Sequence, residues 1–148
     1  MINHNLIETG SWVDAIGQIT SAVGATQQIT NSEDFYQGLI VIGDGLQSVG
    51  NALQGLGETD PLGAKGDWIQ VVGAGTASVG AALQLDRDNA EGMRLGILGN
   101  SLQALGAALS SVAEEDHILV IASKLQSVGA VLNAIGTVKQ LYGLKKKD

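Results

Sequence analysis

Aliphatic residues recur along the chain at a spacing that predicts amphipathic helices. Over long stretches Val, Leu and Ile lie three and four residues apart, as in Leu46, Val49, Leu53 and Leu56, and this spacing marks one helix face. We expect helices near residues 10–30, 34–57, 61–86, 89–113 and 117–144. Because the segments between them are short, successive helices should run antiparallel. The pattern therefore predicts an all-α, five-helix, up-and-down antiparallel array, formed by residues 1–148 as a single helical repeat domain.

Polar residues at the expected helix ends support these boundaries. Asp60 stands before Pro61, which places a capping carboxylate ahead of a proline at the first helical position. Residues 88–91, Asp-Asn-Ala-Glu, have the spacing of a capping box. Acidic residues also open the second and the fifth expected helix, at positions 33–34 and 114–116, where they complement the helix dipole.

Glycines follow a second and stricter pattern within the same segments. Fifteen of the 21 glycines fall into five triplets whose members are seven residues apart. The triplets are Gly10, Gly17 and Gly24; Gly43, Gly50 and Gly57; Gly66, Gly73 and Gly80; Gly92, Gly99 and Gly106; and Gly129, Gly136 and Gly143. Seven residues are close to two helical turns, so each triplet lines up along one helix face. We call such a row a glycine lane.

A glycine lane implies close packing between helices. Gly inside a helix costs about 0.5–1 kcal/mol relative to Ala, so fifteen such positions need a compensating gain. Without a Cβ atom, two backbones approach closely, and dispersion and Cα–H···O contacts accumulate along the lane. The sequence therefore predicts glycine-mediated helix packing. The residues expected to carry it are Gly17, Gly24, Gly43, Gly50, Gly57, Gly73, Gly80, Gly99, Gly106, Gly129 and Gly136.

The other positions of the expected helices are mostly small or mildly polar. We call the rows of Val, Leu and Ile along the helices aliphatic ridges. Ala, Ser and Asn fill the faces away from these ridges, so we expect outer faces that are small and mildly polar. A row of glutamines beside the lanes is expected to make interhelical or backbone hydrogen bonds. Trp12 and Trp68 each stand two residues after a lane glycine, and we expect them to pack in the core or to anchor a partner.

The charge distribution argues against nucleic acid as a partner. The net charge is −7, and residues 1–64 hold seven acids and neither Lys nor Arg. Such a surface repels phosphate backbones. The basic run at residues 145–147 is expected to be a solvated helix end. The first residues lack the basic and apolar regions of a signal peptide, so the expected location is the cytoplasm.

No residue pattern predicts catalysis, a metal or a cofactor. The chain has no Cys, and its histidines are His4 and His117. His117 follows three acids, but consecutive helical residues point in different directions, which favours a solvated cap over a metal site. Residues 71–80 imitate a dinucleotide fingerprint, yet Ser78 stands at the third glycine position and the glycines belong to a lane. We therefore expect no enzyme activity.

Three glycine-containing segments carry a resemblance. Residues 10–17, 43–54 and 99–106 resemble repetitive glycine-heptad helical proteins of spore-forming Gram-positive bacteria, a family of unknown function. The resemblance implies a helical repeat fold and assigns no activity or site residue.

Two functions follow from the shortage of charged outer faces. The first is a non-catalytic structural or self-associating helical repeat protein that packs through glycine lanes, with itself as partner in a homo-oligomer or filament. The alternative is a membrane-associated or membrane-active helical protein. Polar residues within the helices, and the lack of an apolar stretch near 20 residues, disfavour the membrane alternative.

Overall fold

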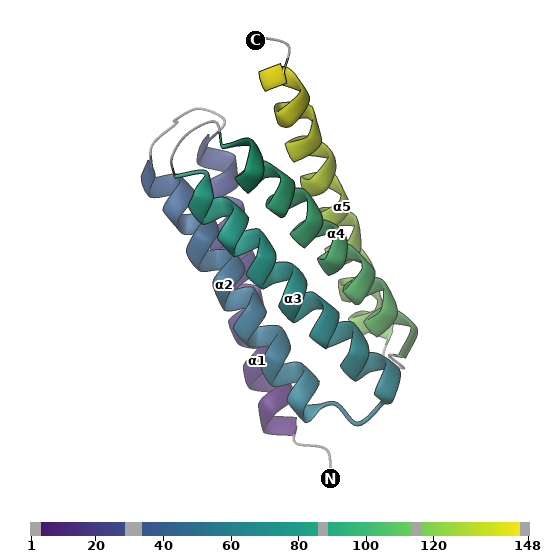
Figure 1. Cartoon of the computed structure of the whole chain (residues 1–148). Helices are drawn as coiled ribbons and strands as arrows, with labels where there is room; N and C mark the ends of the chain where they lie inside the picture. The colour runs from purple at the N-terminus through teal and green to yellow at the C-terminus, as the bar shows by residue number, and fades with distance from the viewer. Residues whose placement is uncertain (1–3, 29–33, 86–88, 114–116, 146–148) are drawn as a thin grey trace.

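Five helices form the protein (Figure 1). The computed structural model describes residues 4–28, 34–85, 89–113 and 117–145. The helices are α1 (His4–Gln28), α2 (Asp34–Gly57), α3 (Pro61–Leu83), α4 (Ala90–Ala113) and α5 (His117–Lys145). The prediction of an all-α fold with five helices is confirmed. The observed bounds match the expected ones within a few residues except at α1, which begins at His4 instead of near residue 10.

The start of α3 follows the predicted capping chemistry. Asp60 Oδ1 accepts hydrogen bonds from the backbone N–H groups of Leu62 and Gly63, at 2.8 and 2.9 Å. Pro61 opens the helix, where its missing N–H group has no partner to lose. The sequence of this boundary therefore determines its structure locally.

The start of α4 differs from the expected capping box by one residue. Asn89 Oδ1 accepts hydrogen bonds from the N–H groups of Glu91 and Gly92, at 3.0 and 3.1 Å, so the carboxamide of Asn89 caps this helix. Asn and Asp are equally good caps, and the sequence places them side by side. Asp88, Glu33 and the acids at 114–116 lie outside the described residues.

The helices pack in chain order as a curved, open row. Among the described helices, only neighbours in sequence approach within 8 Å between Cα atoms. Figure 1 shows α2 and α3 at the front, with α1 behind α2 and α5 behind α4. Helices α1 and α5 are therefore the two ends of the row, and each packs against a single neighbour.

Opposed glycines bring the backbones of α1 and α2 into contact, and those of α3 and α4 likewise. A Cβ atom added to Gly17 would lie 2.6 Å from the carbonyl oxygen of Gly43. A Cβ atom on Gly99 would lie 2.6 Å from the carbonyl oxygen of Gly73. The other opposed pairs are Gly10 with Gly50, Gly66 with Gly106, and Gly80 with Gly92. Only a residue without a Cβ atom permits these approaches.

Serine hydroxyls join the helices at the other two contacts, α2 with α3 and α4 with α5. Each serine begins a Ser-Val-Gly tripeptide and donates a hydrogen bond to a backbone carbonyl of the neighbouring helix. The bonds run from Ser48 to Val71 (3.0 Å), from Ser78 to Val41 (2.8 Å) and from Ser127 to Ala104 (2.9 Å). Lane contacts and serine contacts therefore alternate along the row.

The interior is small and polar, whereas the exterior is aliphatic. Buried side chains include Ala74, Ala107 and Asn51, and Asn51 is only 2% exposed. Exposed side chains include Val49 and Leu105. The expectation of small, mildly polar outer faces is therefore wrong. At about 100° per residue, the lane and the serine face of a helix lie on one side, and the aliphatic ridge lies on the other.

The tryptophans follow the aliphatic ridges to the outside. Trp12 is 66% exposed and Trp68 is 45% exposed. The expectation that they pack in the core is wrong. Viewed down the helix axis, a residue two positions after a lane glycine lies outside the sector between the glycine lane and the serine face, so the packed helices do not enclose it. Their alternative role as partner anchors stays a prediction.

The lane geometry predicts opposite effects for two Gly→Ala substitutions. In Gly99→Ala, the new Cβ atom would lie 2.5 Å from the backbone nitrogen of Ala77, so we expect a loss of about 1–3 kcal/mol in the free energy of unfolding. Gly38→Ala places its Cβ atom where nothing lies within 4 Å. It should stabilise the helix by about 0.5–1 kcal/mol.

Urea unfolding followed by circular dichroism, at one fixed protein concentration, measures both changes. Equal effects of the two substitutions would contradict the backbone contact between α3 and α4.

Candidate functional site

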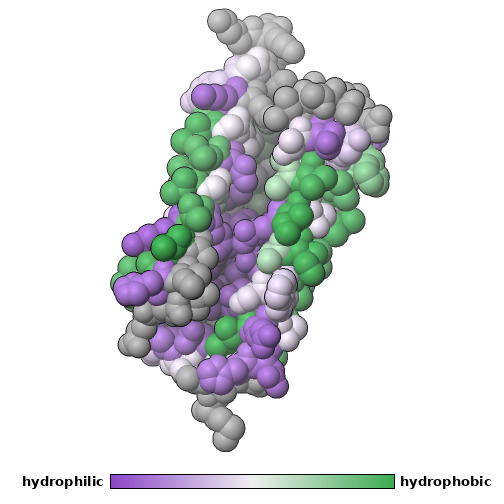
Figure 2. Space-filling model, turned by 180° about the vertical axis from the view of Figure 1, so that it is seen from behind, coloured by the Kyte–Doolittle hydropathy of each residue, from purple (hydrophilic) through white to green (hydrophobic). Residues whose placement is uncertain are grey.

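A polar groove lies behind the row of helices, between α1 and α2 on one side and α4 and α5 on the other. It encloses about 550 Å³. Figure 2 shows hydrophilic residues in this hollow and hydrophobic ridges on both sides of it. The lining residues are Gln18, Ser21, Ala22, Ala25, Thr26, Asp44, Gln47, Asn100, Gln103, Leu125, Gln126, Gly129, Ala130 and Asn133. Side-chain amides are the commonest polar groups in the groove.

Asp44 places a buried carboxyl group in the groove. It follows the lane residue Gly43 on α2, so its side chain lies next to the contact with α1. Asp44 Oδ1 accepts hydrogen bonds from Ser21 Oγ at 2.8 Å and from Gln47 Nε2 at 3.2 Å. Burial raises the pKa of the Asp44 carboxyl to about 6, and the hydrogen bond from Ser21 acts in the opposite direction. This carboxyl therefore exchanges its proton near neutral pH.

Asp14 is a second buried carboxyl, on α1. Its Oδ2 atom accepts a hydrogen bond from Gln18 Nε2 at 2.7 Å. Its Oδ1 atom is buried and accepts no hydrogen bond from the described residues. Burial raises the pKa of Asp14 to about 6, against the smaller effect of the Gln18 hydrogen bond. Burial thus shifts the protonation equilibrium of two carboxyl groups in one hairpin toward the protonated form, relative to an exposed aspartate.

The α3–α4 hairpin repeats the Ser–Asp contact of the α1–α2 hairpin. Ser110 Oγ donates a hydrogen bond to Asp67 Oδ1 at 3.0 Å, as Ser21 does to Asp44. In both hairpins the serine stands four residues after a lane glycine, and the aspartate stands one residue after the opposed lane glycine. The same polar contact therefore accompanies each pair of lanes.

The glutamines beside the lanes make the expected kinds of hydrogen bond. Gln70 Nε2 lies 3.4 Å from Ser110 Oγ of the neighbouring helix. Gln84 Nε2 donates to the carbonyl oxygen of Gly80 at 3.1 Å. Gln37, for which no role was predicted, donates a hydrogen bond to the carbonyl oxygen of Ala81 at 2.8 Å.

The packing glycines of the sequence analysis fall into two groups. Gly17, Gly24, Gly43, Gly50, Gly73, Gly80, Gly99 and Gly106 lie against the backbone of a neighbouring helix. Gly57 is buried at the end of α2. Gly129 and Gly136 differ from these, because nothing lies within 4 Å of the Cβ position of either residue. The lane of α5 has no partner helix among the described residues.

The described side chains of the groove can hydrogen-bond and exchange protons. Amides supply donors and acceptors, and Asp44 supplies a titrating group. Among the described residues, no three of His, Cys, Asp or Glu come together as metal ligands. His4 and His117 are both exposed. The serine contacts were not predicted, although a Ser-Val-Gly tripeptide marks each of them in the sequence.

The outer face of the row is the second candidate site. On α2 the exposed residues after Asp34 are Phe35, Ile42, Val49 and Leu56, each seven residues after the last. Exposed aliphatic residues also recur on the other four helices, for example Ile16, Val72, Leu105 and Leu132. Such an exposed apolar surface is typical of a site that contacts another protein or a membrane.

The buried carboxyls predict that stability decreases as the pH rises. The folded Asp44 holds its proton up to about pH 6, whereas the unfolded one releases it near its ordinary pKa of 3.8. The contribution of Asp44 to stability is therefore greatest below about pH 4 and is lost by about pH 6. We expect Asp44→Asn to stabilise the fold at pH 7.5, by up to about 3 kcal/mol.

Urea unfolding at pH 4, 5.5 and 7.5 measures this effect. Glu8→Gln, the same charge change at an exposed position of α1, is the control and should stay within about 0.5 kcal/mol of the wild type. If Asp44→Asn is less stable than the wild type at pH 7.5, the prediction that the buried, ionised Asp44 carboxylate destabilises the fold at that pH is wrong.

Comparison with known proteins identifies a family without an assigned activity. No curated protein and no solved structure matches the chain. A family described as "Family of unknown function (DUF6944)" matches residues 5–148, which is nearly the whole chain, and the protein belongs to this family.

Proposed function

We propose that this protein is a non-catalytic structural protein that associates with copies of itself. The observation that carries the proposal is the aliphatic outer face. Contact between water and an exposed row of Ile, Val and Leu side chains is unfavourable in free energy. Burial against another copy removes this surface from water. We place the protein in the cytoplasm, as a homo-oligomer or a filament without nucleic acid.

The spacing of the ridges supports a protein partner. Ile42, Val49 and Leu56 recur every seven residues on α2, which is the repeat of a helix–helix seam. A surface that faces lipid needs no such repeat. The resemblance to glycine-heptad repetitive proteins of spore-forming bacteria fits a repeating structural role.

The lack of charge in the middle of the ridges also supports this role. The described charged residues of α2 and α3 are Asp34, Asp44, Lys65 and Asp67, and the two exposed ones, Asp34 and Lys65, lie within the first five residues of their helices. Depletion of charge is typical of the core of a protein interface. The acidic N-terminal half would limit association through mutual repulsion, so salt should strengthen it.

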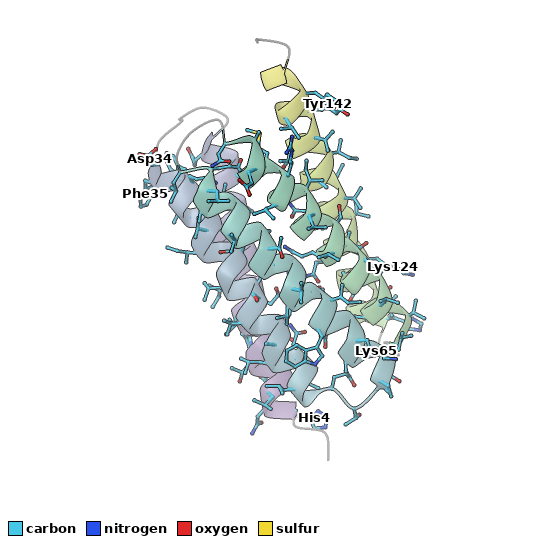
Figure 3. The ribbon with its side chains drawn as sticks, in the orientation of Figure 1. His4, Asp34, Phe35, Lys65, Lys124 and Tyr142 are labelled. Carbon is cyan, nitrogen blue, oxygen red and sulfur yellow. The ribbon has the colours of Figure 1, made fainter. Side chains whose placement is uncertain are left out.

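A membrane-embedded protein is the second candidate. Figure 3 places Asp34, Phe35 and Tyr142 toward one end of the array and His4 and Lys65 toward the other. Aromatic and charged residues at both ends are typical of helices that cross a bilayer. Among the described helices, α4 is long and apolar enough for a crossing. The exposed Lys124, part-way along α5, favours the first candidate.

Sedimentation velocity separates the two candidates. We expect oligomers whose proportion rises over a hundredfold range of protein concentration and rises further with salt. The same samples are floated with vesicles of phosphatidylcholine and phosphatidylglycerol. Flotation with the vesicles, together with failure to oligomerise without lipid, would replace the first candidate by the second. A species of 15.2 kDa in every sample, without vesicle binding, would contradict both.

A lysine in the middle of a ridge tests directly whether that ridge is buried between associated copies. Val49 is 54% exposed, so Val49→Lys should leave the fold intact and weaken association at least about tenfold, because the charge enters an apolar interface. Thr59→Lys, in the exposed connection between α2 and α3, is the matched control and should associate as the wild type does. Equal association of the two variants would exclude the ridge of α2 from the interface.

A further inference from the structure

One helix of the five, α5, carries a glycine lane that meets no other helix in the described part of the chain. Gly129, Gly136 and Gly143 are exposed, and nothing lies within 4 Å of their Cβ positions. The helix α5 packs against α4 through its other side, where Ser127 bonds to Ala104. The lane therefore faces away from α4, and Gly129 lies on the wall of the polar groove.

The rest of the molecule indicates what covers such a lane. Each lane of α1, α2, α3 and α4 lies against the lane of an antiparallel neighbour, backbone to backbone. Lane and serine contacts alternate along the row, and α5 has made its serine contact with α4. The next contact in the alternation is a lane, and the lanes of the other four described helices are already occupied.

The lane of α5 has the same neighbours in sequence as the paired lanes. Leu132 and Asn133 follow Gly129 at the positions where Leu46 and Gln47 follow Gly43. Leu132 is 63% exposed, so the flank of the lane is uncovered as well. An occupant must offer a lane and an aliphatic flank of its own, and α5 of a second copy offers both.

We propose that two copies of this chain associate through α5, with their glycine lanes antiparallel. The proposal rests on the self-association proposed above and names its contact. In both hairpins, opposed glycines step by seven residues in opposite directions along the two helices. The same register sets Gly129 against the partner's Gly136, and Gly136 against the partner's Gly129. The contact is self-complementary, as a two-fold axis requires.

The register also assigns a polar contact beside the lane. At one glycine pair of each hairpin, the residue four after a lane glycine bonds to the residue one after the opposed glycine, as Ser21 bonds to Asp44 at 2.8 Å and Ser110 to Asp67 at 3.0 Å. The corresponding residues of α5 are Asn133 and Thr137. Asn133 therefore faces the partner's Thr137, and its amide can hydrogen-bond to that hydroxyl.

Disulfide formation in a chain without native cysteine tests this register. The double variant Asn133→Cys/Thr137→Cys should form covalent dimers when the associated protein is oxidised. Val131→Cys/Ile135→Cys is the matched control, because both residues are exposed at the same height of α5 and have the same spacing, on the other side of the helix. We expect at least about fivefold more dimer from the first variant on a non-reducing gel.

A variant with a blocked glycine lane provides the second part of the experiment. Gly136→Leu, added to the Asn133→Cys/Thr137→Cys variant, should abolish the covalent dimer, because leucine fills the space of the opposed backbone. The same substitution should keep the melting temperature of the chain or raise it, since its site is open in the single copy. Loss of the dimer in a folded chain would support the proposal.

Two results would overturn the proposal. One is a dimer yield no higher than that of the control variant, and the other is a yield that Gly136→Leu leaves unchanged. Sedimentation of the same samples separates this failure from that of the proposed function. Oligomers without the α5 cross-link would overturn the α5 contact alone, whereas monomers in every sample would overturn both.

Discussion

Backbone contact between opposed glycines is the interaction on which the structure depends. Gly17 and Gly43, or Gly73 and Gly99, meet at distances that no other residue permits. This contact sets the register of each hairpin, because a shift by one residue would place a Cβ atom in the path of the opposing backbone. It also leaves little room between the two helices, so large side chains must lie elsewhere.

The reversed distribution of polarity follows from this packing. The helices touch through glycine, alanine and serine, and the aliphatic ridges lie on the side away from both contact faces. The residues turned inward are amides and carboxyls such as Asn51, Asp44 and Asp14. Hydrogen bonds satisfy most of them, but burial still raises the pKa of both carboxyls to about 6. The interior is therefore held by close approach and hydrogen bonds, with little aliphatic core.

A chain built in this way has exposed surface to cover. The aliphatic ridges offer apolar area to other copies, and the open lane of α5 offers the same backbone contact that the hairpins use internally. The two surfaces complement each other as the basis of an assembly, because the lane sets a register and the ridges add hydrophobic area. In this proposal, one repeating contact organises both the fold and the association.

The helices, several of their caps and the seven-residue lanes follow from the order of residues along the chain. These features depend on local spacing, as at Asp60 and Pro61, and local spacing is read directly from the chain. The candidate groove was not predictable in this way. Its residues come from four helices, and no spacing along the chain relates Gln18 to Asn133. The serine contacts had a signal in the Ser-Val-Gly tripeptides, but nothing in that signal names the carbonyl that accepts the bond.

Which flank of each lane faces inward depends on how the helices pack in three dimensions. A lane has aliphatic residues on one flank and amides on the other, and the seven-residue repeat is the same whichever flank is buried. The row of helices curves so that the amide flanks lie inside. Trp12 and Val49 are therefore exposed, and Asp44 is buried. The lane of α5 likewise depends on the tertiary structure: among the described residues, two hairpins pair four lanes, so none is left for the fifth helix to meet.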